Sequence, residues 1–272
     1  MIFYPIISMG FQLSMLSSIP NETSPQIVYV GEEISDGTQG LIFRANLITG
    51  KESKQIAVKV WKDNVLPQEC DLERQILLDL QGVKGTARLE SFPGADSHKD
   101  RLFLEWAHEG DLFTLIERFQ EKTNPPVLNH DHIYQLFEQL LTAIDAINKL
   151  GYVHRDIKPE NILVYSLTDK KIEVGLSDFG LVVPINTNTG VAGTKPYLPP
   201  SCDRSLWHKY DGSEDMYGVG ITLAILLQFL DKKEFKDEIK FANLVRKSTT
   251  KSIPVLMEEL RRGRLAPPGP PE

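Results

Sequence analysis

The sequence predicts an α+β fold in which a β-rich first part precedes a mainly helical second part. Short runs of β-branched and aromatic residues recur as far as Trp106, with one amphipathic helix among them. Beyond Trp106 the apolar residues mainly follow helical spacing. With 272 residues and 41% hydrophobic side chains, the chain can bury a sizeable core, as one large domain or as two packed lobes.

The first part is expected to contain five strands and one helix. A glycine-bearing turn within 31–40 joins the first two strands into a hairpin. Apolar residues at helical spacing predict an amphipathic helix over 68–80, and the polar stretch 93–100 is expected to be a loop. The five strands are predicted over 27–30, 41–45, 55–61, 86–92 and 101–106.

Three helices are predicted in the second part. They cover 111–120, 132–150 and 216–230, and two prolines separate the first from the second. The third is almost continuously apolar, which is typical of a helix at the centre of a lobe. It is too short for a bilayer, which needs about 20 apolar residues. The proline-rich stretch 266–272 indicates a flexible tail.

Charge and cysteine content narrow the class of protein. The formal net charge is -7 and the isoelectric point is about 5.5. This argues against a nucleic-acid partner and against a general binder of anionic membranes, because each needs a basic surface. The two cysteines, Cys70 and Cys202, cannot build a disulfide framework or a zinc cluster. They suit a reducing compartment, so we expect a cytoplasmic protein.

The apolar extension over 1–26 has an open role. Its first 16 residues contain no Lys or Arg, whereas a secretory signal begins with basic residues. Pro5 and Gly10 interrupt it, and it is too short for a transmembrane helix. We expect it to pack on the domain or to be disordered rather than to associate with a membrane, although an export or membrane signal stays an alternative. The oligomeric state is left open by the sequence.

The most informative stretch is His154–Asn161, which reads H-R-D-I-K-P-E-N and is followed closely by Asp178-Phe179-Gly180. One carboxylate can accept a proton from a hydroxyl, and an amide with a second carboxylate can hold Mg²⁺ on a nucleotide. Phosphoryl transfer needs positioning and charge neutralisation rather than covalent chemistry from the protein. Lys158 adds a cation where the transferred phosphate would develop charge.

At these residues the chain resembles the eukaryotic-type protein kinase family. The lysine two places after the aspartate is similar to the serine/threonine branch, and further motifs follow in the family's order from about Ile34 to Gly220. The resemblance implies a bilobal fold, with a small β-rich lobe over 27–106 and a larger helical lobe over 107–265. It implies ATP and Mg²⁺ as cofactors and proteins carrying Ser or Thr as substrates.

The resemblance also implies roles for single residues. Asp156 would orient the acceptor hydroxyl and take its proton, and Lys158 would neutralise charge. Asn161 and Asp178 would bind Mg²⁺. Asp215 would steady the catalytic loop from the start of the helix over 216–230.

Lys59 matches the family's strand lysine, which contacts the α- and β-phosphates. We expect Glu73 in the following helix to pair with it, and Glu69, one turn earlier, is the alternative. Gly37 and Gly40 would let backbone N–H groups approach phosphate. Leu104 would be the gatekeeper of an apolar adenine pocket, and Glu105-Trp106-Ala107 would be its backbone hinge. The pocket would be lined by Ile34, Ile42, Ala57 and Leu163.

Two further expectations concern packing and regulation. His154 and Phe179 resemble members of the family's internal packing spine. Thr194 would contact Asp156 and Lys158. A phosphate on Thr187 or Thr189 could pair with Arg155, and an unmodified loop is the alternative.

Three departures from the family pattern keep a second hypothesis open. Ser35 stands where the phosphate-covering loop usually has its first glycine, Ser201 replaces a glutamate near the end of the activation segment, and no matching arginine follows Leu230. We therefore expect a reduced C-terminal lobe. The alternative to an active kinase is a kinase-like nucleotide-binding scaffold with little catalysis, a pseudokinase. Against it, every ionic catalytic position is filled.

Overall fold

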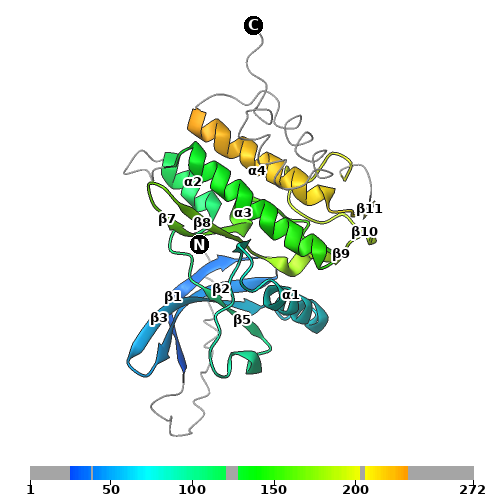
Figure 1. The fold of residues 1–272 in the computed structure, drawn as a ribbon. Helices are drawn as coiled ribbons and strands as arrows, with labels where there is room; N and C mark the ends of the chain where they lie inside the picture. Colours follow the sequence, from blue (N-terminus) through cyan, green and yellow to red (C-terminus); the bar gives the residue numbers. More distant parts are fainter. Residues whose placement is uncertain (1–24, 38, 121–127, 203–205, 232–272) are drawn as a thin grey trace, which may run out of the picture.

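The computed structural model describes residues 25–37, 39–120, 128–202 and 206–231. They form a small lobe, built on a β-sheet and helix α1 (Pro67–Asp79), and a larger, mainly helical lobe (Figure 1). The larger lobe contains α2 (Leu112–Gln120), α3 (His130–Lys149) and α4 (Ser213–Asp231). The bilobal α+β prediction is thus confirmed. The predicted tail, and the predicted extension as far as residue 24, lie outside the described residues.

The sheet of the small lobe is antiparallel, with the order β1-β2-β3-β5. Its strands are β1 (Gln26–Asp36), β2 (Gly40–Thr49), β3 (Glu52–Trp61) and β5 (Arg101–Glu105). Side chains alternate along β3 between the two faces of the sheet. Ile56 and Val58 pack in one cluster with Phe103, whereas Ala57 and Trp61 pack in the larger cluster that includes α1. Lys59 lies between the latter two and shares their face.

The predicted strand over 86–92 is wrong in extent, and the strand that does form pairs with the other lobe. Strand β4 is only Gly85–Thr86, and it pairs in parallel with β8 (Ile172–Leu176) of the larger lobe. The chain then follows β5 through one bridge, Leu89 to Leu104, and through two backbone hydrogen bonds. Local β propensity correctly indicated extended chain here. The first residues of this run, however, pair with a strand of the other lobe, and propensity cannot specify a partner.

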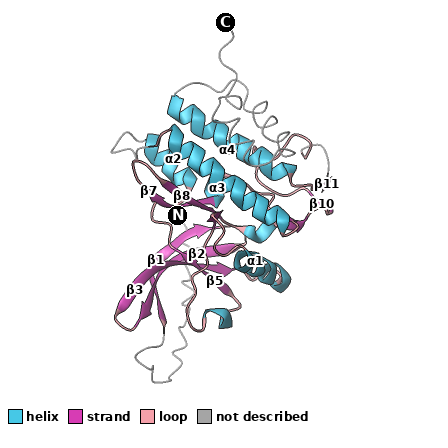
Figure 2. Cartoon of the chain, viewed as in Figure 1, coloured by secondary structure: helices cyan, strands magenta, loops and turns pink. Residues whose placement is uncertain are grey.

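The second part contains strands that the sequence analysis missed (Figure 2). The main pair is β7 (Ile162–Leu167) with β8, which is antiparallel and brings Ile162 opposite Leu176. Shorter strands flank the site: β6 (Tyr152–Val153) pairs with β9 (Val183–Pro184), and β10 (Asn188–Gly190) with β11 (Trp207–Lys209). Single 3₁₀ turns occur at Ala95–Ser97, Pro159–Asn161 and Phe179–Leu181.

The core of the larger lobe lies between α3, α4 and the β7–β8 pair. Helix α3 begins after Asn129, whose Oδ1 accepts a hydrogen bond from the amide of His132, a standard helix cap. Apolar residues of α4 are buried along the helix, as predicted for a central helix. Within the described residues, no helix is long and apolar enough to cross a bilayer.

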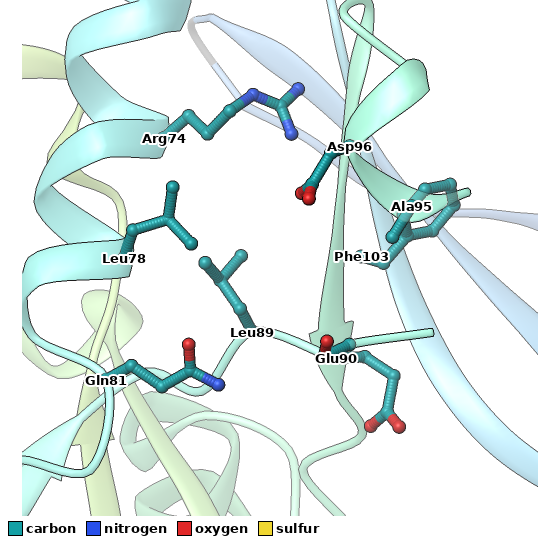
Figure 3. A pocket seen from close by; sticks show the side chains of 9 residues that line it. Arg74, Leu78, Gln81, Leu89, Glu90, Ala95, Asp96 and Phe103 are labelled. Atoms are coloured by element: carbon teal, nitrogen blue, oxygen red, sulfur yellow. The ribbon is translucent and has the colours of Figure 1, made fainter. Parts of the chain in front are cut away.

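A hollow of about 90 Å³ lies on the small lobe between α1 and the chain that leads into β5. Figure 3 shows Arg74 and Leu78 of α1 on one side of it and Asp96 on the other, with Leu89 between them. The guanidinium of Arg74 donates to the carbonyl oxygens of His98 and Arg101, both at 2.8 Å. This side chain therefore ties α1 to the loop before β5.

Gly85 provides a stability prediction. Its φ is +88°, and a Cβ placed on it would lie 2.0 Å from the carbonyl oxygen of Gln139 in α3. Gly82 has φ +84° but no neighbouring atom within 4 Å of such a Cβ. Gly82→Ala should lower the free energy of unfolding by about 1 kcal/mol through backbone strain alone. Gly85→Ala should lower it by about 3 kcal/mol or more, because α3 must also move. Urea unfolding of both variants measures this, and equal losses would contradict the described packing.

Candidate active site

Lys59 on β3 is buried between two carboxylates. Its Nζ lies 2.5 Å from Glu73 Oε1 on α1 and 2.8 Å from Asp178 Oδ1, which follows β8. Burial alone would lower the pKa of Lys59, but the two carboxylates outweigh it and the pKa is raised. The Asp178 side chain is partly exposed, yet the loss of water around its carboxylate still opposes ionisation; Lys59 outweighs this and holds the pKa of Asp178 below the usual range. Lys59 and Asp178 are therefore both charged at neutral pH, and their ion pair joins the two lobes.

Glu73 rather than Glu69 is the partner of Lys59. Glu69 instead accepts a hydrogen bond from the amide of Leu66 and caps its own helix. The second oxygen of Glu73 accepts a hydrogen bond of 2.8 Å from Trp61 Nε1. The sequence analysis missed Trp61, although its place two residues after Lys59 on one strand was a usable signal.

The catalytic-loop residues meet as the sequence predicted. Asp156 Oδ2 lies 2.8 Å from Lys158 Nζ and accepts a hydrogen bond of 3.0 Å from Asn161 Nδ2. Asn161 Nδ2 also donates to the carbonyl oxygen of Asp156, at 2.8 Å. Asp156 Oδ1 is buried and has no hydrogen-bond partner among the described residues. A buried acceptor without a partner is rare in folded proteins, and here it marks a place for a donor from outside.

The two predicted magnesium ligands come together through the β7–β8 pair. Asn161 directly precedes β7 and Asp178 follows β8 by two residues, at the same end of the antiparallel pair. Ser177 joins these ends, because its amide and its hydroxyl both donate to the carbonyl oxygen of Asn161, at 2.8 and 3.0 Å. The carboxylate of Asp178 is 44% exposed, so it is open to a solvent cation.

His154 and Phe179 pack against each other below this site. Both are buried, and their rings meet edge to face with centroids 5.1 Å apart. Burial lowers the pKa of His154, so the imidazole is neutral. Its Nδ1 accepts from the amide of Asp156, which leaves Nε2–H to donate to the carbonyl oxygen of Ser177. His154, besides packing against Phe179, thus also orients the backbone at Asp156.

Asp215, in the first turn of α4, supports a strained segment of the catalytic loop. Arg155 has φ +73°, a left-handed conformation that is costly for a residue with a long side chain. The carboxylate of Asp215 accepts hydrogen bonds of 2.8 Å from the amides of both His154 and Arg155. Burial raises the pKa of Asp215 to about 7, against these two amides, which favour its charged form. This agrees with the steadying role that the resemblance implies.

The phosphate-covering loop is the turn between β1 and β2. A Cβ on Gly40 would lie 2.9 Å from the carbonyl oxygen of Val60 and 3.2 Å from the side chain of Lys59, so glycine is required there. Gln39 Nε2 donates to the carbonyl oxygen of Gly180 at 2.7 Å and links this loop to the larger lobe. No pattern in the sequence indicated that contact.

Three of the predicted adenine-pocket residues share the face of the sheet that carries Lys59. Ile42 is opposite Lys59, and Ala57 is opposite Leu104, which is 8% exposed. Leu163, half-buried on β7, packs against the same apolar cluster as Ala57. Ile34 on β1 is 51% exposed, so it lies at the margin of this group.

Of the predicted hinge residues, Glu105 ends strand β5 and Ala107 lies two residues beyond it. The side chain of Glu105 pairs with Arg88, Oε1 to Nη1 at 3.1 Å. Arg88 also pairs with Glu173 of β8, at 2.7 Å between Nη2 and Oε1, and so links the hinge to the larger lobe. The carboxylate of Glu105 is therefore engaged by Arg88, so the predicted nucleotide contact at the hinge would fall to the backbone of 105–107.

The segment 178–201, which the resemblance identifies as an activation segment, is attached to the catalytic loop, 154–161, at two points. Thr194 Oγ1 accepts a hydrogen bond of 2.8 Å from Lys158 Nζ, and it reaches Asp156 only through that lysine. Arg155 Nε donates to the carbonyl oxygen of Leu181, and its guanidinium covers the ring of Tyr210 at 5.1 Å. Neutral groups thus hold the arginine that the resemblance assigned to a phosphate.

Comparison with known proteins decides the family. The family described as "Protein kinase domain" matches residues 29–260. The chain belongs to the protein kinase family. Serine/threonine-protein kinase PKH1 of Saccharomyces cerevisiae is 33% identical over 179 residues, which cover 62% of this chain and 21% of that protein. Aurora kinase of Yarrowia lipolytica is 30% identical over 204 residues, 71% of this chain and 50% of that protein.

A solved structure supports the same assignment. A chain in the structure of the CAK complex from Chaetomium thermophilum bound to ATP-γ-S is 25% identical, with a TM-score of 0.57. The match covers 77% of this kinase and 63% of that chain. This kinase spans between a fifth and a half of the two curated relatives named above.

The carboxyl of Asp215 provides a pH prediction. Its pKa is about 7 in the folded protein and about 3.9 when unfolded. The folded state binds the extra proton between these values, so the stability from this group is full below about pH 4 and is lost as the pH rises through 7. Unfolding by urea at pH 4 to 8 should show wild-type stability falling relative to Asp215→Asn over that range. Parallel profiles would contradict the raised pKa.

Proposed function

We propose that this kinase transfers the γ-phosphate of ATP to Ser or Thr hydroxyls of proteins. The observation that carries the proposal is the buried and unpartnered Oδ1 of Asp156. A substrate hydroxyl could donate its hydrogen bond to this oxygen. The carboxylate would then orient the hydroxyl and take its proton as the new O–P bond forms.

The neighbouring residues fit the remaining tasks of phosphoryl transfer. Lys158, already bound to Asp156 Oδ2, would face the transferred phosphate with its positive charge. Lys59, held by Glu73, would contact the α- and β-phosphates. Gly37 and Gly40 bound the loop that would cover them, with Gly37 N donating to Gly40 O at 3.0 Å.

Asn161 and Asp178 fit a magnesium ion by their chemistry. Asn161 donates from its side-chain nitrogen to Asp156, which leaves its side-chain carbonyl oxygen available to a cation, and Asp178 offers an accessible carboxylate. Mg²⁺ takes few protein ligands and fills its remaining positions with phosphate oxygens and water. When bound with the nucleotide, it would neutralise phosphate charge.

The serine/threonine specificity rests on Lys158 and Thr194, the pair that the resemblance assigns to that branch and that lies in direct contact. The yeast relative is itself named a serine/threonine-protein kinase. A cytoplasmic location is part of the proposal, supported by the two cysteines, Cys70 and Cys202, which do not form a disulfide. A protein carrying Ser or Thr is the proposed partner.

The contact of Gln39 with Gly180 favours a second candidate, the nucleotide-binding scaffold. It holds the loop that would cover the phosphates against the larger lobe, and Ser35 replaces a glycine in that loop. A scaffold would bind nucleotide without transferring phosphate. The two candidates therefore differ in one measurement, the transfer of label from ATP.

Asp156→Asn provides that measurement. Purified wild-type protein, incubated with radiolabelled ATP, Mg²⁺ and a basic generic protein, should label the protein on Ser or Thr. Asp156→Asn should lower the rate about 100-fold or more, because an amide cannot take the proton. Its melting temperature should still rise with ATP, since Lys59 and Glu73 are untouched. Equal labelling by both proteins would remove Asp156 from its role, and stabilisation by ATP without any wild-type labelling would favour the scaffold.

Thr187 and Thr189 decide whether the kinase needs a phosphate on its activation segment. Since neutral groups already hold Arg155, we expect Thr187→Ala/Thr189→Ala to keep the wild-type rate within about two-fold. Arg155→Ala should lower that rate more strongly, because it releases the carbonyl of Leu181 and the ring of Tyr210. Rates of peptide phosphorylation measure both variants. A large loss in the double alanine variant would instead support regulation by phosphorylation.

A further inference from the structure

Trp61 contacts the pair of charged residues that the proposed function needs, from a position that the family motifs do not include. Lys59 and Trp61 are two residues apart on β3, so both side chains point to the face against which α1 packs. The carboxylate of Glu73 lies across them. Oε1 is 2.5 Å from Lys59 Nζ, and Oε2 is 2.8 Å from Trp61 Nε1.

The burial of Glu73 makes the second contact important. Glu73 is only 2% exposed, so water cannot replace a lost partner. An ionised carboxylate in such a place needs donors at both oxygens. Lys59 satisfies Oε1, whereas Trp61 is the partner that satisfies Oε2 among the contacts described above. Without the indole N–H, the carboxylate would tend to turn or α1 would tend to move outward, and either change would alter the position of Lys59.

Trp61 itself is held in place from both sides. The residue is 8% exposed and packs with Ile76, Leu77 and Leu80 in the main apolar cluster. Its amide donates to the carbonyl oxygen of Asp100 at 3.2 Å. The guanidinium of Arg74 lies 5.3 Å from the centre of the indole ring and is tied to the loop before β5 (Figure 3). The indole N–H of Trp61 is therefore held in one orientation, toward Glu73.

We propose that Trp61 is a positioning residue for phosphoryl transfer. Its indole N–H holds Glu73, and through Glu73 it holds Lys59, in the arrangement that receives the phosphates of ATP. This donor fixes Glu73 from within the small lobe, while Asp178 of the larger lobe contacts Lys59 from the other side. Only the expected kinetic effect of Trp61 rests on the proposed function. The contact of Trp61 with Glu73 does not depend on that function.

Trp61→Phe tests this role, because phenylalanine keeps an aromatic ring and loses the donor. We expect kcat/KM for ATP to fall about ten-fold, while KM for the protein substrate changes less than two-fold. A merely structural loss would affect both substrates. In a Glu73→Gln background, Trp61→Phe should change kcat/KM by less than two-fold, because the charged acceptor is already gone. Trp207→Phe, on an exposed ring of the larger lobe, is the matched control and should match wild type.

Two further measurements test the role of Trp61 if the variant does not fold or if the protein transfers no phosphate. If Trp61→Phe does not fold, benzothienylalanine at position 61 replaces the N–H by sulfur at nearly the same shape and takes its place. Amide hydrogen exchange without nucleotide should be faster in 73–77 of the variant and unchanged in α3. If wild type transfers no phosphate, the proposed function fails, yet faster exchange in α1 still supports the role of Trp61. Unchanged exchange in α1, or additive effects of Trp61→Phe and Glu73→Gln, would overturn it.

Discussion

The arrangement of the whole site depends on one buried lysine. Lys59 is 6% exposed, and a lone ammonium group at such a depth would lose its proton or unfold its surroundings. It stays charged because Glu73 comes from α1 and Asp178 comes from the larger lobe. Strand β3, helix α1 and the segment after β8 are separate in sequence and must therefore come together around Lys59 Nζ. The positions of α1 against the sheet and of the segment after β8 both follow from that requirement.

Two residues of the candidate site have strained backbone conformations. Arg155 and Asp178 both have positive φ, and each lies next to a group that the proposed chemistry uses. Such conformations persist only when the surroundings hold them. At Arg155 the two amide hydrogen bonds to Asp215 do so, and at Asp178 the ion pair with Lys59 does. Helix α4 of the larger lobe thus supports the strained backbone at Arg155, whereas Asp178 is held from the small lobe.

Particular residues show how far the sequence could predict this site. Asp156, Lys158 and Asn161 lie within six residues, so their spacing made their meeting predictable, and their contacts agree. The pairing of Glu73 was predictable from helical spacing with one alternative left. The strand over 86–92 was not, because its first residues pair with β8 of the other lobe. The contacts of Gln39 and Trp61 were missed: strand alternation indicated the face of Trp61, but its contact with Glu73, like that of Gln39 with Gly180, forms between separate elements.

The sequence by itself determined the chemical groups and their order: a lysine on a strand, a glutamate on the next helix, and two acidic loops at motif spacing. Periodicity is a local property, and it assigns each side chain to a face of its own element. Only the tertiary structure decided which groups touch: Glu73 with both Lys59 and Trp61, Arg155 with neutral acceptors, and Asp156 with one oxygen left unpaired. These contacts depend on how strands, helix and loops pack together, and free energies of burial and long-range pairing set that packing.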